Sequence, residues 1–155
     1  MAEDVLLVAA RERVVTSFGD IRRNIADVSV EGLNWKPGPE TNSLTAITTH
    51  AIGATRNWLC IAVAAPWPER DRASEFRATS EDAGALVSYL DGIEADCLRL
   101  IDEARDIDWS ATRKGLRPGQ EISAAWALVN GVDHLREHVG QLFLTRQLWE
   151  QQAGR

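Results

Sequence analysis

The sequence has no unbroken apolar stretch long enough to span a bilayer, so no transmembrane helix is predicted. Acidic Glu3 and Asp4 stand where a secretory signal peptide would carry basic residues, and we therefore expect no signal peptide. Cysteine is scarce as well, because Cys60 and Cys97 are the only two and cannot form a disulfide framework. Together these absences favour a protein of the reducing cytoplasm that does not bind membranes.

Positive charge is also in short supply. Lys36 and Lys114 are the only lysines, and 17 basic residues face 23 acidic ones, which gives a net charge of -6. A chain of this charge without a basic stripe is not expected to bind nucleic acid. Its composition, 45% apolar and 26% charged, is that of a globular protein, and its length predicts one domain over residues 1–155.

Four stretches of the chain carry apolar residues at helical spacing, and none has the alternation of a convincing strand. We predict a first helix from about Val5 to Val28 and a second from about Ser43 to the prolines at 66 and 68. A third should run from Thr79 or Ser80 to an irregular stretch that begins at Asp106, and a fourth from about Ser123 to Gln151. The polar connection over residues 69–79 is long enough to cross the end of a bundle. These features predict an all-α four-helix bundle.

The apolar seam of each predicted helix identifies the expected core. In chain order the seam residues are Val14, Phe18, Ile21, Ile25 and Val28; Leu44, Ile47, Ala51, Ala54, Trp58 and Ile61; Leu86, Leu90, Ile93, Cys97 and Leu100; and Leu128, Val132, Leu135, Val139 and Leu142. Burying one seam per helix against the others is the simplest way for such a chain to form a core.

The chain contains three histidines in all, and two of them, His134 and His138, are one helical turn apart. This spacing puts both rings on one helical face, close enough to share a metal ion. His50 flanks the seam of the second predicted helix, and a bundle can bring it opposite the pair. Three neutral imidazoles can then hold an ion and leave positions open for water or substrate. The competing interpretation is a structural bundle with incidental histidines.

Two blocks of sequence around these histidines resemble the DinB-like superfamily. The first block contains Leu33-Asn34-Trp35-Lys36-Pro37, Thr41-Asn42-Ser43, His50, Gly53 and Arg56-Asn57-Trp58, and the second contains His134, His138, Gly140-Gln141 and Arg146-Gln147. The resemblance implies a four-helix bundle with up-down-down-up topology. It also implies a divalent metal ion, zinc or nickel in many members, with His50, His134 and His138 as its ligands. Members of the superfamily are often dimers.

The resemblance further implies an activity. The better-understood branches are transferases or isomerases that use mycothiol, bacillithiol or glutathione, and the arginine-rich composition, typical of a GC-rich bacterial genome, favours mycothiol. We therefore expect a metal-dependent enzyme that joins a thiol to a small electrophile, the ion binding the thiol sulfur and favouring the thiolate. The alternatives are a metal-dependent hydrolase and a non-catalytic metal-binding bundle that binds a ligand or a protein partner.

Four further residues are candidates to orient a ligand or to contact substrate. Asn57 and Asn130 lie two turns and one turn from the nearest histidine in sequence, although a solvated helix face is an equal alternative for both. Arg56 could meet a substrate carboxylate or be an ordinary surface arginine. Trp35 could form a pocket wall or pin its loop to the bundle.

The cysteines are not predicted to bind the metal ion. Cys97 lies on an apolar seam, where a small buried residue is expected. Cys60 follows His50 by ten residues, so the helical step points it to a different face.

Apolar residues on the outer face of the last predicted helix indicate a partner. Trp126 and Leu144 lie opposite its seam, and exposed apolar residues there predict a partner helix, most simply in a homodimer. Asp133 and Glu137 flank the histidine pair but point elsewhere around the helix.

Overall fold

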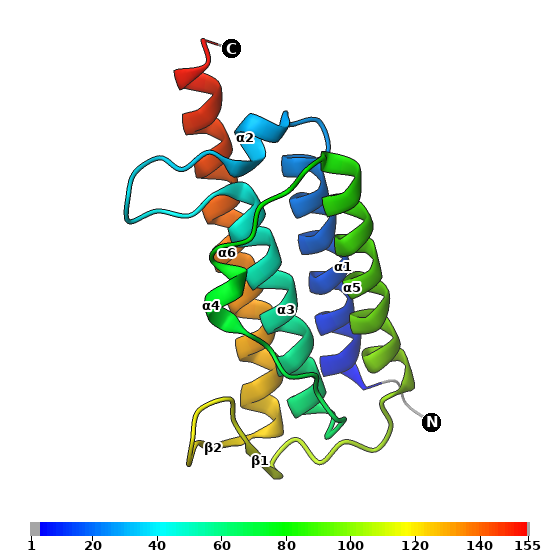
Figure 1. Cartoon of the computed structure of the whole chain (residues 1–155). Helices are drawn as coiled ribbons and strands as arrows, with labels where there is room; N and C mark the ends of the chain where they lie inside the picture. The colour runs from blue at the N-terminus through cyan, green and yellow to red at the C-terminus, as the bar shows by residue number, and fades with distance from the viewer. Residues whose placement is uncertain (1–3, 155) are drawn as a thin grey trace.

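The chain folds around four long helices, in a computed structural model that describes residues 4–154. They are α1 (Val5–Ile25), α3 (Leu44–Ala62), α5 (Ala83–Glu103) and α6 (Ala124–Gln152). Figure 1 shows α1 and α6 running upward and α3 and α5 running downward, which is the up-down-down-up order. The predicted all-α bundle is confirmed. Glu3 and the outermost positions of the predicted domain, 1–3 and 155, lie outside the described residues.

Each long helix begins at a side chain that accepts a hydrogen bond from a free amide of the first turn. The capping residues are Asp4, Ser43, Asp82 and Ser123. Ser43 and Ser123 are the predicted starts of their helices. The helix expected to open at Thr79 or Ser80 opens later, because the Asp82 carboxylate, not a hydroxyl, accepts from the amide of Ala85 at 2.7 Å.

The first helix ends earlier than predicted. It stops at Ile25, and a short helix, α2 (Val30–Asn34), follows after a cap at Ser29. The apolar spacing continued through Val28, which is buried although it lies outside the helix. An apolar residue is needed at position 28 because that side chain is buried, and its spacing from Ile25 therefore predicted one more helical turn. Helix α2 covers the end of the bundle and buries Leu33 completely.

The four helices share one continuous apolar core. Every predicted seam residue is buried in it except Leu100 and Val132, which are half-buried. Helix α3 packs against α5 and α6, and α1 packs against the same two helices. Only Thr49 and Arg56 of α3 are not buried, so this helix lies almost wholly inside the protein, most of its polar side chains included. Within residues 4–154, no helix combines the length and apolarity needed to cross a membrane.

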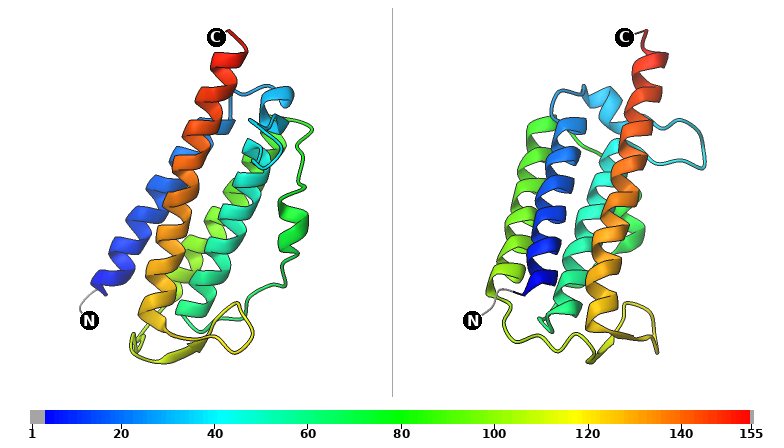
Figure 2. Two further views of the ribbon diagram at one scale, coloured as in Figure 1. Left: turned by 90° about the vertical axis from the view of Figure 1, so that its left-hand side faces the viewer. Right: turned by 180° about the vertical axis from the view of Figure 1, so that it is seen from behind.

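The connection between α3 and α5 (residues 63–82) runs along the side of the bundle and does not cross its end. Because α3 and α5 point the same way, the chain must travel back over the length of a helix before α5 can begin (Figure 2, left). This connection carries a short helix, α4 (Arg72–Glu75), on the outer side of α3.

A small hairpin precedes α6 and corrects the expectation of no strand. Strands β1 (Thr112–Lys114) and β2 (Glu121–Ser123) pair antiparallel, with Arg113 opposite Ile122. Each strand has three residues and almost no apolar content, so the sequence held no alternating pattern to detect. The hairpin lies at the lower end of the bundle in Figure 1.

Two glycines of α6 test the close packing of this helix. A Cβ added at Gly131 would lie 2.9 Å from Cβ of Trp58 on α3, whereas one added at Gly140 would meet nothing within 4 Å. We expect Gly131→Ala to lower the free energy of unfolding by about 1–3 kcal/mol through overpacking. Gly140→Ala should raise it by up to about 1 kcal/mol, because alanine favours the helix. Urea unfolding followed by circular dichroism measures both, and equal effects would contradict the packing.

Candidate metal centre

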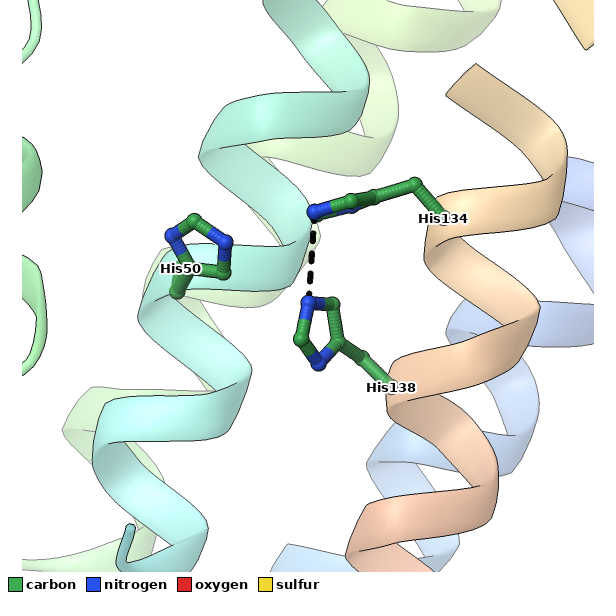
Figure 3. Close-up of side chains that lie close together, drawn as sticks. All are labelled: His50, His134 and His138. Atoms are coloured by element: carbon green, nitrogen blue, oxygen red, sulfur yellow. Dashed lines mark hydrogen bonds between the residues drawn. The ribbon is translucent and has the colours of Figure 1, made fainter. Parts of the chain in front are cut away.

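Three histidines meet where α3 faces α6. Figure 3 shows the rings of His134 and His138 pointing from α6 toward α3, which carries His50. One ring nitrogen from each histidine lies within 4.8 Å of the other two. The ring of His50 is 5.1 Å from that of His134 and 5.0 Å from that of His138, between centroids. The fold therefore brings the three histidines together, as the sequence predicted.

The geometry of the pair on α6 fits a shared ion. The Nε2 atoms of His134 and His138 are 3.2 Å apart. Two nitrogens bound to one tetrahedral zinc at about 2.0–2.1 Å would lie about 3.3 Å apart. A set of three imidazole nitrogens suits zinc, nickel and neighbouring late transition ions. The residues present therefore fit a divalent ion of this kind.

The two histidines of α6 are held in the neutral form. Burial, helped by the charges of His138 and His50, lowers the pKa of His134 to about 4. Burial also lowers the pKa of His138, although a hydrogen bond with Gln141 opposes this. Neutral imidazole is the form that binds metal ions, so both rings are ready to bind at neutral pH.

His50 is tied into a buried ion pair. Its Nδ1 donates to Oε2 of Glu75 at 2.9 Å, since a carboxylate can only accept. Arg70 donates to both oxygens of Glu75, at 2.7 and 2.6 Å, and also to the backbone carbonyl of His50 at 3.3 Å. Burial raises the pKa of Glu75, but the hydrogen bonds from His50 and Arg70 outweigh it and leave the pKa below its usual value. The carboxylate is therefore charged, and the Nε2 lone pair of His50 stays free.

The α3–α5 connection also places an aromatic ring and a cation beside the cluster. The ring of Phe76 lies 4.5 Å from that of His50, between centroids. The guanidinium of Arg72 lies over the Phe76 ring at 4.9 Å. Sequence reasoning missed Arg70, Glu75 and Phe76, because they lie in a polar connection without periodicity. A carboxylate on a segment next to the His50 helix was the available signal, but spacing does not fix how such a segment folds back.

The two predicted asparagines have different surroundings. Asn57 is buried and donates to the carbonyl of Pro68 at 3.2 Å, so it fastens the connection to α3. Asn130 is half-buried one turn before His134. Asn57 thus has a structural partner, whereas the role of Asn130 beside the histidines stays a prediction.

The structure does not bring Arg56 or Trp35 to the histidines. Arg56 bonds to Asp96 of α5 at 3.3 Å, and the arginine charges that act on His134 come from Arg70 and Arg72. Trp35 packs on Trp149 near the end of α6, with ring centroids 5.7 Å apart. This contact fits the predicted role in which Trp35 pins its loop to the bundle.

The cysteines and the two acidic residues beside the histidine pair lie outside the histidine group. Cys60 and Cys97 are buried free thiols outside the histidine cluster, and burial raises the pKa of both. Asp133 and Glu137 are exposed on α6 and point away from the core. Neither pair supplies a nitrogen, sulfur or oxygen to the group around His50.

The bundle and its histidines define a class: an up-down-down-up helical bundle with a three-histidine group that could hold a metal ion. The sequence profile of the DinB superfamily matches residues 7–142, and the chain belongs to this superfamily. A conserved protein from Enterococcus faecalis has a similar structure, with a TM-score of 0.75 and 17% identity over 95% of this chain and 98% of that one.

A second structure with this fold is a DinB-like protein from Bacillus cereus ATCC 10987. Its TM-score is 0.66 at 13% identity, over 90% of this chain and 87% of that one. At such identities the likeness concerns the fold alone. No curated protein matches the chain.

The lowered pKa values of His134 and His138 predict how the stability of the metal-free protein depends on pH. The unfolded chain takes up protons below pH 6.5, whereas folded His134 takes one up only near pH 4. The neutral His134 ring therefore makes its full contribution to the free energy of unfolding above pH 6.5, and this contribution is lost as the pH decreases toward 4. Thermal unfolding in EDTA between pH 7 and pH 5 should show this loss, and His134→Gln should reduce it.

The control for this experiment is Asp133→Asn on the exposed face of the same helix, which should keep the wild-type pH dependence. An unchanged pH dependence in His134→Gln would contradict the buried, neutral state of this ring.

Proposed function

We propose that this protein is a metal-dependent enzyme, a transferase or isomerase that uses a low-molecular-weight thiol, such as mycothiol, with a small electrophilic substrate. The observation that supports this best is the convergence of three imidazoles, from α3 and α6, to within 4.8 Å of one another. The thiol-dependent branches of the superfamily that the sequence resembles supply the reaction class.

His50, His134 and His138 would hold the ion, zinc or nickel, from one side. His134 and His138 are half-buried, so the cluster can be reached from solvent, while His50 is only 4% exposed. An ion held in this way supplies positive charge that favours the thiolate of a coordinating thiol, and so provides the nucleophile. Phe76 lies against the His50 ring and excludes water from that side of the cluster.

The cellular setting follows from the same proposal. We place the protein in the cytoplasm, where a thiol cofactor stays reduced, and the free thiols of Cys60 and Cys97 are in keeping with that setting. Its partner is a small molecule, not nucleic acid or a membrane, and residues 1–155 act as one domain.

Metal content tests the proposal first. The untagged protein should contain about one zinc, nickel or similar ion per chain by elemental analysis. The double variant His134→Ala/His138→Ala should lose it, because two of three ligands are gone. A thiol should then react with an electrophile, such as a halogenated aromatic, only in the loaded wild-type protein.

The matched control is Asp133→Ala/Glu137→Ala, which changes two exposed positions of the same helix. This control should keep both metal and turnover. No metal in the wild type, even after reconstitution, would refute the proposed enzyme. Metal without thiol turnover would favour a metal-binding bundle without this activity.

We also propose that the protein is a homodimer formed through the outer face of α6. Val129, Phe143, Leu144 and Leu148 on this helix are exposed, and Leu144 is 57% exposed. Trp126 is exposed too, but its ring packs on that of Trp58 of α3, with centroids 5.5 Å apart. Light scattering should give twice the chain mass for the wild type and one chain mass for Leu144→Glu. Val15→Glu, at an exposed apolar position on α1, should remain a dimer. A monomeric wild type would contradict this interface.

A further inference from the structure

The three histidines differ in what their Nδ1 atoms meet. Nδ1 of His50 donates to the carboxylate of Glu75 at 2.9 Å. Nδ1 of His138 lies 2.7 Å from the amide oxygen of Gln141, which is an uncharged acceptor. Nδ1 of His134 is buried and has no partner within residues 4–154. His50 is thus the one member of the group supported by a charged residue.

Glu75 is built into this position. The residue is only 9% exposed, and Arg70, whose side chain is 12% exposed, donates to both of its carboxylate oxygens. A buried carboxylate is costly unless it is paired and hydrogen-bonded. Here Oε2 is shared between Arg70 at 2.6 Å and His50 at 2.9 Å, so the pair fixes the direction in which the carboxylate faces the ring.

Helix α3 leaves room for this ion pair at Gly53, one turn after His50. A Cβ at this position would lie 3.1 Å from Nε of Arg70 and 3.3 Å from Oε1 of Glu75. Both contacts are tighter than ordinary van der Waals packing. The missing side chain therefore lets Arg70 and Glu75 lie against α3, level with His50.

The connection does not need this ion pair to be anchored to the bundle. Asn57 bonds to the carbonyl of Pro68, and Asn34 bonds to both the amide and the carbonyl of Ser80. These contacts fasten the connection on either side of Glu75. The hydrogen bond between Glu75 and Nδ1 of His50 is therefore not needed to hold the connection against the bundle.

We propose that Glu75, held by Arg70, is a positioning residue for His50, an inference that rests on the proposed metal centre. Its carboxylate keeps the proton of His50 on Nδ1, which leaves the Nε2 lone pair for the ion. It also fixes the ring plane, as carboxylates behind metal-binding histidines do. His50 is the firmly held ligand of the three, and His134 is the least supported.

The test compares Glu75→Gln with Glu94→Gln in the full chain. Glu94 is a matched control, because it too pairs with an arginine, Arg22 at 2.6 Å, and its side chain is 16% exposed. Competition with a chelator gives the zinc affinity of each folded variant. We expect about 10–100-fold weaker binding for Glu75→Gln and wild-type affinity for Glu94→Gln.

A second variant and a second readout separate positioning from general stability. Glu75→Asp keeps a charge for Arg70 but withdraws the carboxylate from His50, so it should also weaken zinc binding. Nitrogen-15 NMR of the metal-free wild type should show His50 in the single tautomer with the proton on Nδ1. Glu75→Gln should show a mixture, which loss of stability alone would not produce.

The outcomes separate this inference from the proposed function. If the wild type binds zinc and both Glu75 variants bind it equally well, with an unchanged tautomer, the positioning role is overturned and the metal centre stands. If the wild type binds no zinc, the metal centre itself is overturned, and the inference with it.

Discussion

Helices α3 and α6 pack closely because Gly131 of α6 has no side chain where it meets Trp58 of α3. A Cβ atom at position 131 would lie only 2.9 Å from the Cβ of Trp58. This contact sets the distance across which His50 faces His134 and His138. The pair on α6 is close enough to share an ion by itself, with Nε2 atoms 3.2 Å apart. The third nitrogen depends on how near α3 is held, so the close packing of the two helices is a condition for a three-ligand site.

The almost complete burial of α3 explains the residues that surround the site. Helix α3 carries several buried polar side chains, and a buried polar group needs a hydrogen-bond partner. The hydroxyl of Thr55 bonds to the carbonyl of Ala51, Asn57 bonds to the connection, and His50 bonds to Glu75. The α3–α5 connection must run the length of the bundle because α3 and α5 point the same way. It passes the histidines on its way and provides the carboxylate of Glu75 that supports His50.

Much of this arrangement could be predicted from the sequence, but not all of it. The apolar period of 3.6 residues identified the four helices, and the i, i+4 spacing identified His134 and His138 as a pair. His50 could be added because it flanks the seam of the second predicted helix, and the resemblance to a known family then supported the same three ligands. Glu75 and Arg70 could not be found in this way, because their contacts with His50 depend on how a polar segment folds back. The hairpin before α6 was missed for a similar reason, since its strands bury little.

X-ray absorption at the metal edge of the loaded protein tests the central claim most directly, because it reports the ligands of the ion themselves. We predict three imidazole nitrogens at about 2.0–2.1 Å with an oxygen from solvent, if the ion is zinc. On addition of a thiol, a sulfur should replace that oxygen at about 2.3 Å. A shell of oxygens alone, or a sulfur already present before any thiol is added, would contradict an open three-histidine site.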